Sequence, residues 1–74
     1  MTWKRILYRM HTVRRLRERR ITRQQVRQLL ATGTRRRQGG TRWVAEGALD
    51  RWPARLVFQE SADTITVITV MWTG

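Results

Sequence analysis

The sequence predicts an α+β fold in which two N-terminal helices pack on a three-stranded antiparallel meander sheet, in the order α-α-β-β-β. Two observations predict it. Residues 12–32 have helical apolar spacing and helix-end signals, whereas residues 42–72 contain three segments rich in β-branched and aromatic residues. The chain length of 74 residues fits one small domain, residues 1–74, with a thin core.

The clearest strand is Thr64–Trp72, with the sequence TITVITVMW. β-branched side chains are stiff and fit a pleated surface, so this segment is expected inside the sheet rather than at its edge. Its alternation is interrupted, because Ile65 and Val67 face one side and the even-numbered apolar residues that follow face the other. These even-numbered residues are Ile68, Val70 and Trp72. Either both faces of the strand are covered, or a bulge between Val67 and Ile68 resets the alternation.

Two further strands are expected at Arg42–Glu46 and Arg55–Glu60. Gly47–Pro53 is rich in turn residues and is expected to connect them, since proline cannot pair in the middle of a sheet. Residues 61–63 (Ser-Ala-Asp) form a short hairpin turn before the last strand. Short links between successive strands favour antiparallel pairing, and hence a meander.

The first helix is expected from Thr12 to Arg19 or Arg20. Met10, Val13 and Leu16 recur at three-residue steps and are expected to form its buried stripe. The opposite face is then polar and almost wholly cationic.

The second helix is expected at Arg23–Thr32. Thr22 and Gln25 match a capping box, in which a hydroxyl and an amide side chain bond to each other's backbone N–H groups. Gly33 is expected to end the helix in a left-handed conformation.

Two segments are less regular. Residues 1–10 have apolar residues at helical spacing, but Ile6 and Tyr8 also alternate as in a strand, and an extended lead-in or short strand is favoured. Thr34–Thr41 contains three consecutive arginines and a Gly-Gly pair, with no apolar residue, and is expected to be a loop. This loop is either a solvated connector or a flexible basic finger that follows a phosphate backbone.

Charge is the most informative part of the composition. Lys and Arg number 16 against five acids, for a net charge of +11, and every cation but Lys4 is arginine. Residues 1–42 contain 14 of these cations and a single acid, Glu18. Such asymmetry indicates a polyanionic partner, and the planar fork of arginine favours nucleic acid over an anionic membrane or an acidic protein. An alternative is that a GC-rich genome or thermal adaptation raises the arginine content.

Several classes of site are excluded by residue type. There is no cysteine and one histidine, so neither a disulfide nor a zinc site is expected, and no cofactor motif occurs. No apolar run approaches the roughly 20 residues that cross a bilayer, and charged residues interrupt the first ten positions. The expectation is a cytoplasmic protein with no metal, cofactor or membrane partner.

A candidate catalytic group lies in the first helix, where His11, Arg15, Glu18 and Arg19 follow i, i+4, i+7 and i+8 spacing. RNA can be cut without metal when its 2′-hydroxyl attacks the adjacent phosphorus. His11 would carry protons, the arginines would stabilise the developing negative charge, and Glu18 would orient an arginine or carry a second proton, a role also open to Tyr8. The alternatives are a structural His11 and a surface ion pair between Glu18 and an arginine one turn away.

Other cations are predicted to contact nucleic acid without taking part in catalysis. Among the tryptophans, Trp52 is the best candidate for an exposed residue that stacks on a base, whereas the others are expected in the core. The predicted nucleic-acid-binding arginines are Arg9, Arg14, Arg23, Arg35, Arg36, Arg37 and Arg42.

The string from His11 to Thr22 resembles the pattern H-x3-R-x2-E-R-x-I, followed by a capped helix and a glycine, of a bacterial domain-of-unknown-function family (the 4258 type). Val67–Val70 resembles the last strand of that family, which is similar to the RelE, ParE and BrnT toxins of toxin–antitoxin systems. The resemblance implies two helices on an antiparallel sheet, RNA as substrate and an antitoxin as partner. The chain departs from the family at Arg20, where a glycine near the helix joint is usual.

The sequence therefore leaves three alternative functions open. The first is a metal-independent endoribonuclease toxin whose site is the cationic helix face. The second is a non-catalytic module that binds RNA, the ribosome or another nucleic acid. The third is an interaction domain whose basic face meets an acidic antitoxin segment, with strand addition to a sheet edge as one route and a second copy of the chain as a further candidate partner.

Overall fold

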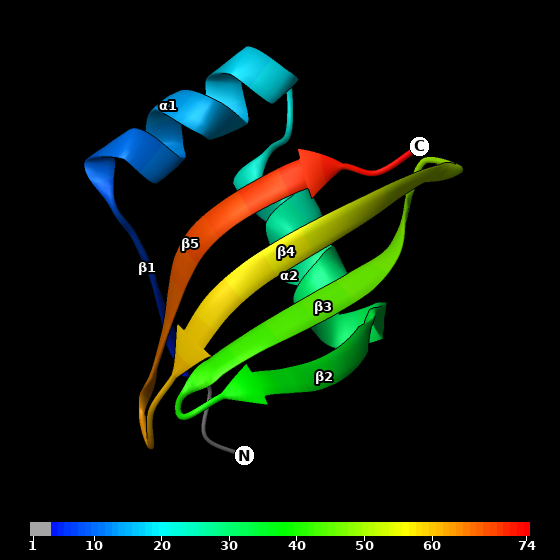
Figure 1. Cartoon of the computed structure of the whole chain (residues 1–74). Helices are drawn as coiled ribbons and strands as arrows, with labels where there is room; N and C mark the ends of the chain where they lie inside the picture. Colours follow the sequence, from blue (N-terminus) through cyan, green and yellow to red (C-terminus); the bar gives the residue numbers. More distant parts are fainter. Residues whose placement is uncertain (1–3) are drawn as a thin grey trace.

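The computed structural model describes residues 4–74 and contains two helices and one five-stranded sheet (Figure 1). The sequence order of the elements is β-α-α-β-β-β-β. Their bounds are β1 Arg5–Tyr8, α1 Met10–Arg19, α2 Arg23–Thr32, β2 Thr34–Gly39, β3 Arg42–Leu49, β4 Trp52–Glu60 and β5 Thr64–Trp72.

The spatial order of the strands is β1-β5-β4-β3-β2. Strands β2 to β5 form an antiparallel meander, and β1 lies parallel to β5 at the other side of the sheet. The α+β class is correct, but the prediction of a three-stranded antiparallel sheet is wrong, because both edge strands were missing from it. The extended reading of residues 1–10 is confirmed for β1, and residues 1–3 lie outside the described part of the chain.

The prediction of a loop at Thr34–Thr41 is wrong, since β2 occupies most of it. Every residue of β2 is exposed, so no buried face imposes an apolar alternation on its sequence. Its pairing with β3 ends at a turn in which Gly39 and Gly40 both have positive φ, of 153° and 55°. Glycine adopts these angles at little cost, which explains the Gly-Gly pair.

Strands β3 and β4 extend through the predicted connection Gly47–Pro53, which is therefore wrong as well. Only Asp50 and Arg51 form the turn, and both have positive φ, of 51° and 76°. A two-residue turn of this kind matches the twist of the strands, although Asn-Gly is the usual sequence. Pro53 pairs with Ala48 near the start of β4, where a missing N–H disturbs few bonds.

The interruption in the alternation of β5 is a bulge. Val57 of β4 pairs with Thr69 and Phe58 pairs with Val67, so Ile68 is the additional residue. The bulge places Ile65, Val67, Val70 and Trp72 on the same side of the sheet, as the second of the two sequence interpretations requires. β5 is also an interior strand, as predicted.

Both helices lie on one side of the sheet, where they enclose the core (Figure 1). Helix α1 packs against β5, and α2 packs against β3 and β4. The opposite side of the sheet is not covered by either helix. The buried apolar residues between helices and sheet are Leu16, Ile21, Val26, Leu29, Leu30, Ala45, Leu49, Ala54, Leu56, Phe58, Ile65, Val67 and Val70.

The buried face of α1 differs from the predicted one. Met10 is 84% exposed, whereas Thr12 is fully buried and Leu16 lies one turn further along the same face. The Oγ1 atom of Thr12 lies 3.1 Å from the carbonyl oxygen of Val67 and 2.9 Å from that of Ile68, so its hydroxyl donates to the bulge of β5. The hydrogen bonds of Thr12 replace the apolar contact that was expected from Met10. The spacing of apolar residues therefore predicted the wrong buried face for the start of α1.

Helix α2 begins and ends as predicted, and the capping box of Thr22 and Gln25 is present in both directions. Glycine is required at position 33 for a different reason from the one predicted. Its φ of −71° is not left-handed, but a Cβ atom at this position would lie 2.6 Å from the carbonyl oxygen of Leu29. Glycine is therefore needed here for space, and not for a left-handed turn.

Candidate nucleic-acid interface

Arg19 joins the end of α1 to β5. Its Nη1 atom donates to the carbonyl oxygen of Val70 at 2.6 Å and to Oγ1 of Thr69 at 3.3 Å. Its own carbonyl oxygen accepts a hydrogen bond of 2.9 Å from Nε1 of Trp72. The structure thus turns Arg19 towards the sheet and separates it from the other members of the predicted catalytic group.

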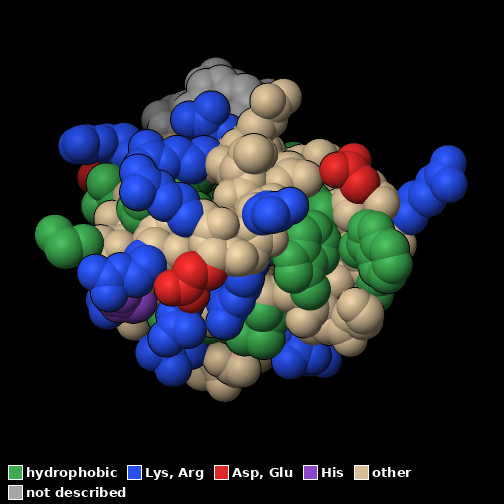
Figure 2. All heavy atoms as spheres, turned by 90° about the horizontal axis from the view of Figure 1, so that it is seen from above, with side chains coloured by type: hydrophobic (Ala, Val, Ile, Leu, Met, Phe, Trp, Pro, Cys, Tyr) green, Lys and Arg blue, Asp and Glu red, His purple; other side chains and the backbone are tan. Residues whose placement is uncertain are grey.

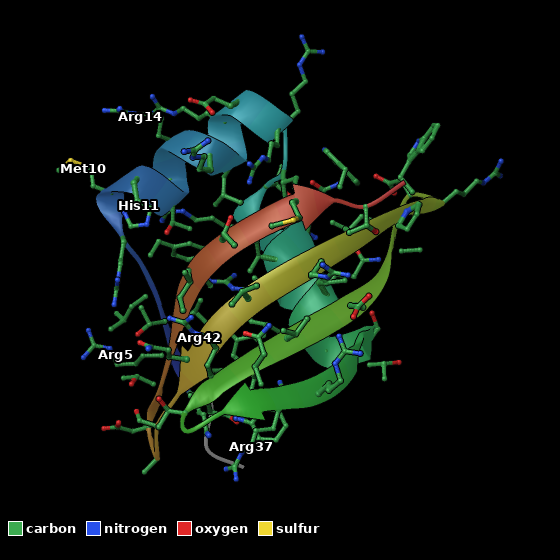
Figure 3. All side chains as sticks on the ribbon, in the orientation of Figure 1. Arg5, Met10, His11, Arg14, Arg37 and Arg42 are labelled. Carbon is green, nitrogen blue, oxygen red and sulfur yellow. The ribbon has the colours of Figure 1, made fainter. Side chains whose placement is uncertain are left out.

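His11, Arg15 and Glu18 do share an exposed flank of α1. Nη1 of Arg15 lies 3.9 Å from Oε2 of Glu18, and both side chains are 55% exposed. This confirms the surface ion pair that was the alternative interpretation of Glu18, and such a long, exposed pair contributes little to stability. In the described residues the side chain of His11 has no hydrogen-bond or ion-pair partner, and it lies in the open on α1 (Figure 3).

Tyr8, the other candidate proton carrier, is directed towards the core. Its hydroxyl is buried and has no hydrogen-bond partner in the part of the chain that the structure describes. Burial raises the pKa of Tyr8, against the opposing charges of Arg27 and Arg23, so the phenol stays neutral at neutral pH. The guanidinium carbon of Arg23 lies 4.9 Å from the centre of the Tyr8 ring, which ties this predicted nucleic-acid-binding arginine to the protein itself.

Glu46 pairs with two arginines on the open side of the sheet. Its carboxylate lies 3.0 Å from Nη2 of Arg36 and 3.5 Å from Nη2 of Arg55. Arg55 of β4 is the register partner of Glu46 on β3, and Arg36 of β2 pairs with Val44, two residues from Glu46 on the same side of the sheet, so it reaches Glu46 diagonally. Arg36, predicted to bind nucleic acid, is therefore already engaged with an acid of its own chain.

Glu60, the last residue of β4, pairs with two cations on the helix side of the sheet. Its Oε2 lies 3.0 Å from Nζ of Lys4 and 3.4 Å from Nη1 of Arg35. The hydrogen bond from Lys4 is the main reason that the pKa of Glu60 is lowered; desolvation opposes it, and the charge of Arg35 adds to it. Arg35 also donates to the carbonyl oxygen of Leu30 at 3.1 Å, so a second predicted nucleic-acid-binding residue is held within the molecule.

Arg37 is the third arginine of β2, and its guanidinium carbon lies 5.3 Å from the centre of the Trp43 ring. Trp43 and Trp72 pack against the core, as predicted for most of the tryptophans. Trp52 is 62% exposed, which confirms its predicted exposure, and it follows the turn of Asp50 and Arg51 at the end of the sheet away from β1.

A different set of cations is free of such contacts. Each is exposed, and in the described residues its side chain has no ion-pair or hydrogen-bond partner. We call this set the cationic rim. Its members are Arg5 of β1, Arg9 at the start of α1, His11 and Arg14 of α1, and Arg42 of β3.

The register of the sheet relates Arg5 to Arg42. Leu7, Thr66, Gln59 and Arg42 are successive partners across β1, β5, β4 and β3, so they share the side opposite the helices. Arg5 lies two residues before Leu7 and therefore has the same orientation. Figure 3 shows labelled members of the rim on α1, β1 and β3, and Figure 2 shows Lys and Arg side chains gathered around the histidine on the side of α1.

Four other exposed arginines have neither an acidic nor an aromatic partner in the described residues, and they are spread over α1, its C-cap, α2 and the β3–β4 turn: Arg17, Arg20, Arg27 and Arg51. Of the rim, Arg9, His11, Arg14 and Arg42 were candidates from the sequence. Arg5 was missed, because its place on the open side follows only from the pairing of β1 with β5.

Other kinds of site find little support in the described residues. No group of three or more His, Asp or Glu side chains there is arranged to hold a metal ion. Among these same residues, no helix has the length and apolar character that crossing a bilayer requires.

Comparison with known proteins places the chain in a family. No curated protein and no solved structure matches it, so its similarity to the RelE, ParE and BrnT toxins stays a prediction. A family model described as "Domain of unknown function (DUF4258)" matches residues 8–72, which span both helices and the four strands of the meander. The chain therefore belongs to the DUF4258 family.

Proposed function

We propose that the protein binds nucleic acid, with RNA as the first ligand to test, through the cationic rim. One observation carries this proposal. Glu46 and Glu60 pair with the cations near them on the sheet, whereas those of the rim have no acid to pair with in the described part of the chain. Unpaired guanidinium groups on β1, α1 and β3 suit a ligand that presents a row of phosphates.

The physical consequence is a strong dependence on salt. Each phosphate that the rim neutralises releases condensed counterions, so the logarithm of the binding constant falls linearly with the logarithm of salt concentration. Replacing one contacting arginine is expected to reduce that slope by about one and to weaken binding to all sequences alike.

The experiment compares matched charge removals. Arg9→Gln and Arg14→Gln remove rim cations, and Arg51→Gln removes an exposed cation at the far turn of the sheet. Affinity for a short fluorescent RNA is measured over a range of salt concentrations. The rim variants are expected to lose affinity and slope, and the Arg51 variant is expected to lose much less. Equal losses in all three variants, or binding that does not vary with salt, would reject the rim as the interface.

A second candidate function is metal-independent RNA cleavage, with which a toxin role and an acidic antitoxin partner are associated. One observation favours it: His11 is exposed among the rim cations and shares its flank of α1 with Arg15 and Glu18. In this reaction the 2′-oxygen attacks phosphorus, His11 accepts the 2′-hydroxyl proton, and the 5′-oxygen leaves with a proton from solvent or Glu18. The products would be a 2′,3′-cyclic phosphate and a 5′-hydroxyl.

The test is RNA cleavage in the presence of EDTA. Wild type is expected to form the cyclic phosphate, His11→Ala to lose this activity, and Arg51→Gln to retain it. If wild type and His11→Ala release the same background amount, the catalytic candidate is rejected, while the binding proposal still stands or falls on the salt experiment.

A further inference from the structure

Strand β2 is an open edge of the sheet. In the described structure it pairs with β3 on one side only, and all six of its residues are exposed. An exposed edge presents a row of backbone N–H and C=O groups to which another strand can add.

The turn between β3 and β4 determines which backbone N–H and C=O groups of β2 point away from the sheet. The two-residue turn at Asp50 and Arg51 makes Leu49 and Trp52 a hydrogen-bonded pair, so the odd-numbered residues of β3 bond to β4 and the even-numbered ones to β2. Val44 and Glu46 therefore bond to their β2 partners, which are Arg36 and Thr34.

The other residues of β2, Arg35 and Arg37, consequently direct their N–H and C=O groups outwards. Long charged side chains often protect such an edge, but here they are drawn back over their own sheet. Arg35 reaches the carbonyl oxygen of Leu30, and Arg37 lies on the ring of Trp43. Arg36 extends over the opposite side to Glu46. The backbone of the edge is thus left accessible.

We propose that this edge binds an extended, acidic segment of a partner protein by antiparallel strand addition. Residues on an added strand would lie beside Arg35 and Arg37 on one side of the sheet and beside Arg36 on the other. Glu60 and Glu46 each face two cations, so the edge keeps a net positive charge that favours carboxylates on either side of the added strand. A second copy of the chain fits poorly. Antiparallel pairing of two β2 strands centred on Arg36 would set arginine directly opposite arginine at three successive positions.

This surface adjoins the cationic rim at one residue, Arg42 of β3, which pairs with Gly39 of β2. β1 and β2 are the two opposite edges of the sheet, so Arg5 of the rim lies four strands away from the proposed peptide site. Arg9 and Arg14 belong to α1 and its start, so their variants test the nucleic-acid ligand without altering the β2 edge.

The first experiment uses the wild-type protein and a short peptide of alternating Glu and Val, followed by NMR amide hydrogen exchange. Binding is expected to slow exchange of the Arg35 and Arg37 amides and to leave that of Arg36 unchanged, since Arg36 already bonds to β3. A peptide of alternating Lys and Val is expected not to bind. Protection confined to α1, or no protection of the β2 amides, would overturn the proposal.

The second experiment separates backbone from side chain at one position. Arg37→Ala removes the cation but keeps the outward N–H, whereas Arg37→Pro removes both. The proline variant is expected to bind the acidic peptide about tenfold more weakly than the alanine variant, provided that circular dichroism shows both to be folded. Equal affinities would mean that the peptide is held by charge alone. Protection of Arg35 and Arg37 at high protein concentration without peptide would instead identify a second copy as the occupant, and if the proline variant does not fold, the exchange experiment decides.

Discussion

The indole nitrogen of Trp72 donates a hydrogen bond of 2.9 Å to the carbonyl oxygen of Arg19. This carbonyl belongs to the last residue of α1, where helical carbonyls have no partner within the helix. Arg19 returns the contact by donating from Nη1 to the carbonyl oxygen of Val70. Arg19 and the last strand are thus connected in both directions, across more than fifty residues of chain.

Trp72→Phe removes the indole donor and keeps most of the apolar surface. We expect a loss of about 1 kcal/mol in the free energy of unfolding, since one hydrogen bond is lost and a half-buried carbonyl is left without its partner. Urea denaturation measures it. Trp52→Phe is the control, because its exposed indole is expected to contribute little. Equal stability of the Trp72 variant and wild type would contradict the role of this bond.

Arg20 ends α1 with φ of 55°, a left-handed conformation that is unfavourable for a residue with a Cβ atom. Its N–H and that of Ile21 bond back to the carbonyl oxygens of Arg17 and Leu16, which is a Schellman arrangement. Arg20→Gly is expected to raise stability by about 1 kcal/mol in thermal unfolding.

The control for this substitution is Arg20→Gln, which removes the same charge and keeps the backbone strain. A stabilisation of equal size in the two variants would mean that relief of charge repulsion is responsible, and would contradict the conformational explanation.

Tyr8→Phe removes a buried hydroxyl that has no hydrogen-bond partner in the described residues. Because nothing in the protein compensates the desolvation of this group, the variant is expected to be as stable as wild type or more stable, by up to about 1 kcal/mol. The contact of the ring with Arg23 is kept. Denaturant unfolding is the measurement, and a loss of stability would show that the hydroxyl has a favourable contact in solution.

Glu60 makes stability depend on pH. Its pKa in the folded protein is below the ordinary value of 4.5, so the folded state favours the ionised carboxylate more than the unfolded state does. The stabilisation from its contacts with Lys4 and Arg35 is therefore complete above the ordinary pKa and is lost as pH falls through the lowered one.

Glu60→Gln is expected to be less stable than wild type at neutral pH, with a difference that shrinks as the pH falls below the ordinary pKa of the group. Thermal melts over an acid pH series measure this. A difference that stays constant with pH would show that the loss is one of packing and not of ionisation. Asp63→Asn is the matched control, an exposed acid near the same hairpin.

The parts of the fold that the sequence predicts correctly are those with local chemical signals. The capping box at Thr22, the end of α2 at Gly33 and the apolar strand β5 each depend on residues close together in the chain. Even the bulge at Ile68 was visible as an interrupted alternation.

The parts that were mispredicted are set by tertiary contacts. β2 has only polar residues and glycine, and it is a strand because β3 pairs with it. The buried face of α1 depends on Thr12, whose hydroxyl finds acceptors only when β5 is in place.

The candidate site shows the same division. Net charge predicted a cationic surface, but which arginines remain available is decided by Glu46 and Glu60, residues distant in the chain that pair with Arg35 and Arg36. Arg19 has the spacing of the exposed group, yet its length and the nearby carbonyl of Val70 direct it to the sheet.

The additional residue in β5 has one more consequence. Removing Ile68 would leave every other side chain of the strand on its present side, because the alternation of the shortened segment would become regular. A variant lacking this residue should therefore retain its core, yet it would lose one of the two acceptors beneath Thr12 and hold α1 less firmly. In this protein the additional residue of a strand supplies a carbonyl oxygen that holds a helix against the sheet.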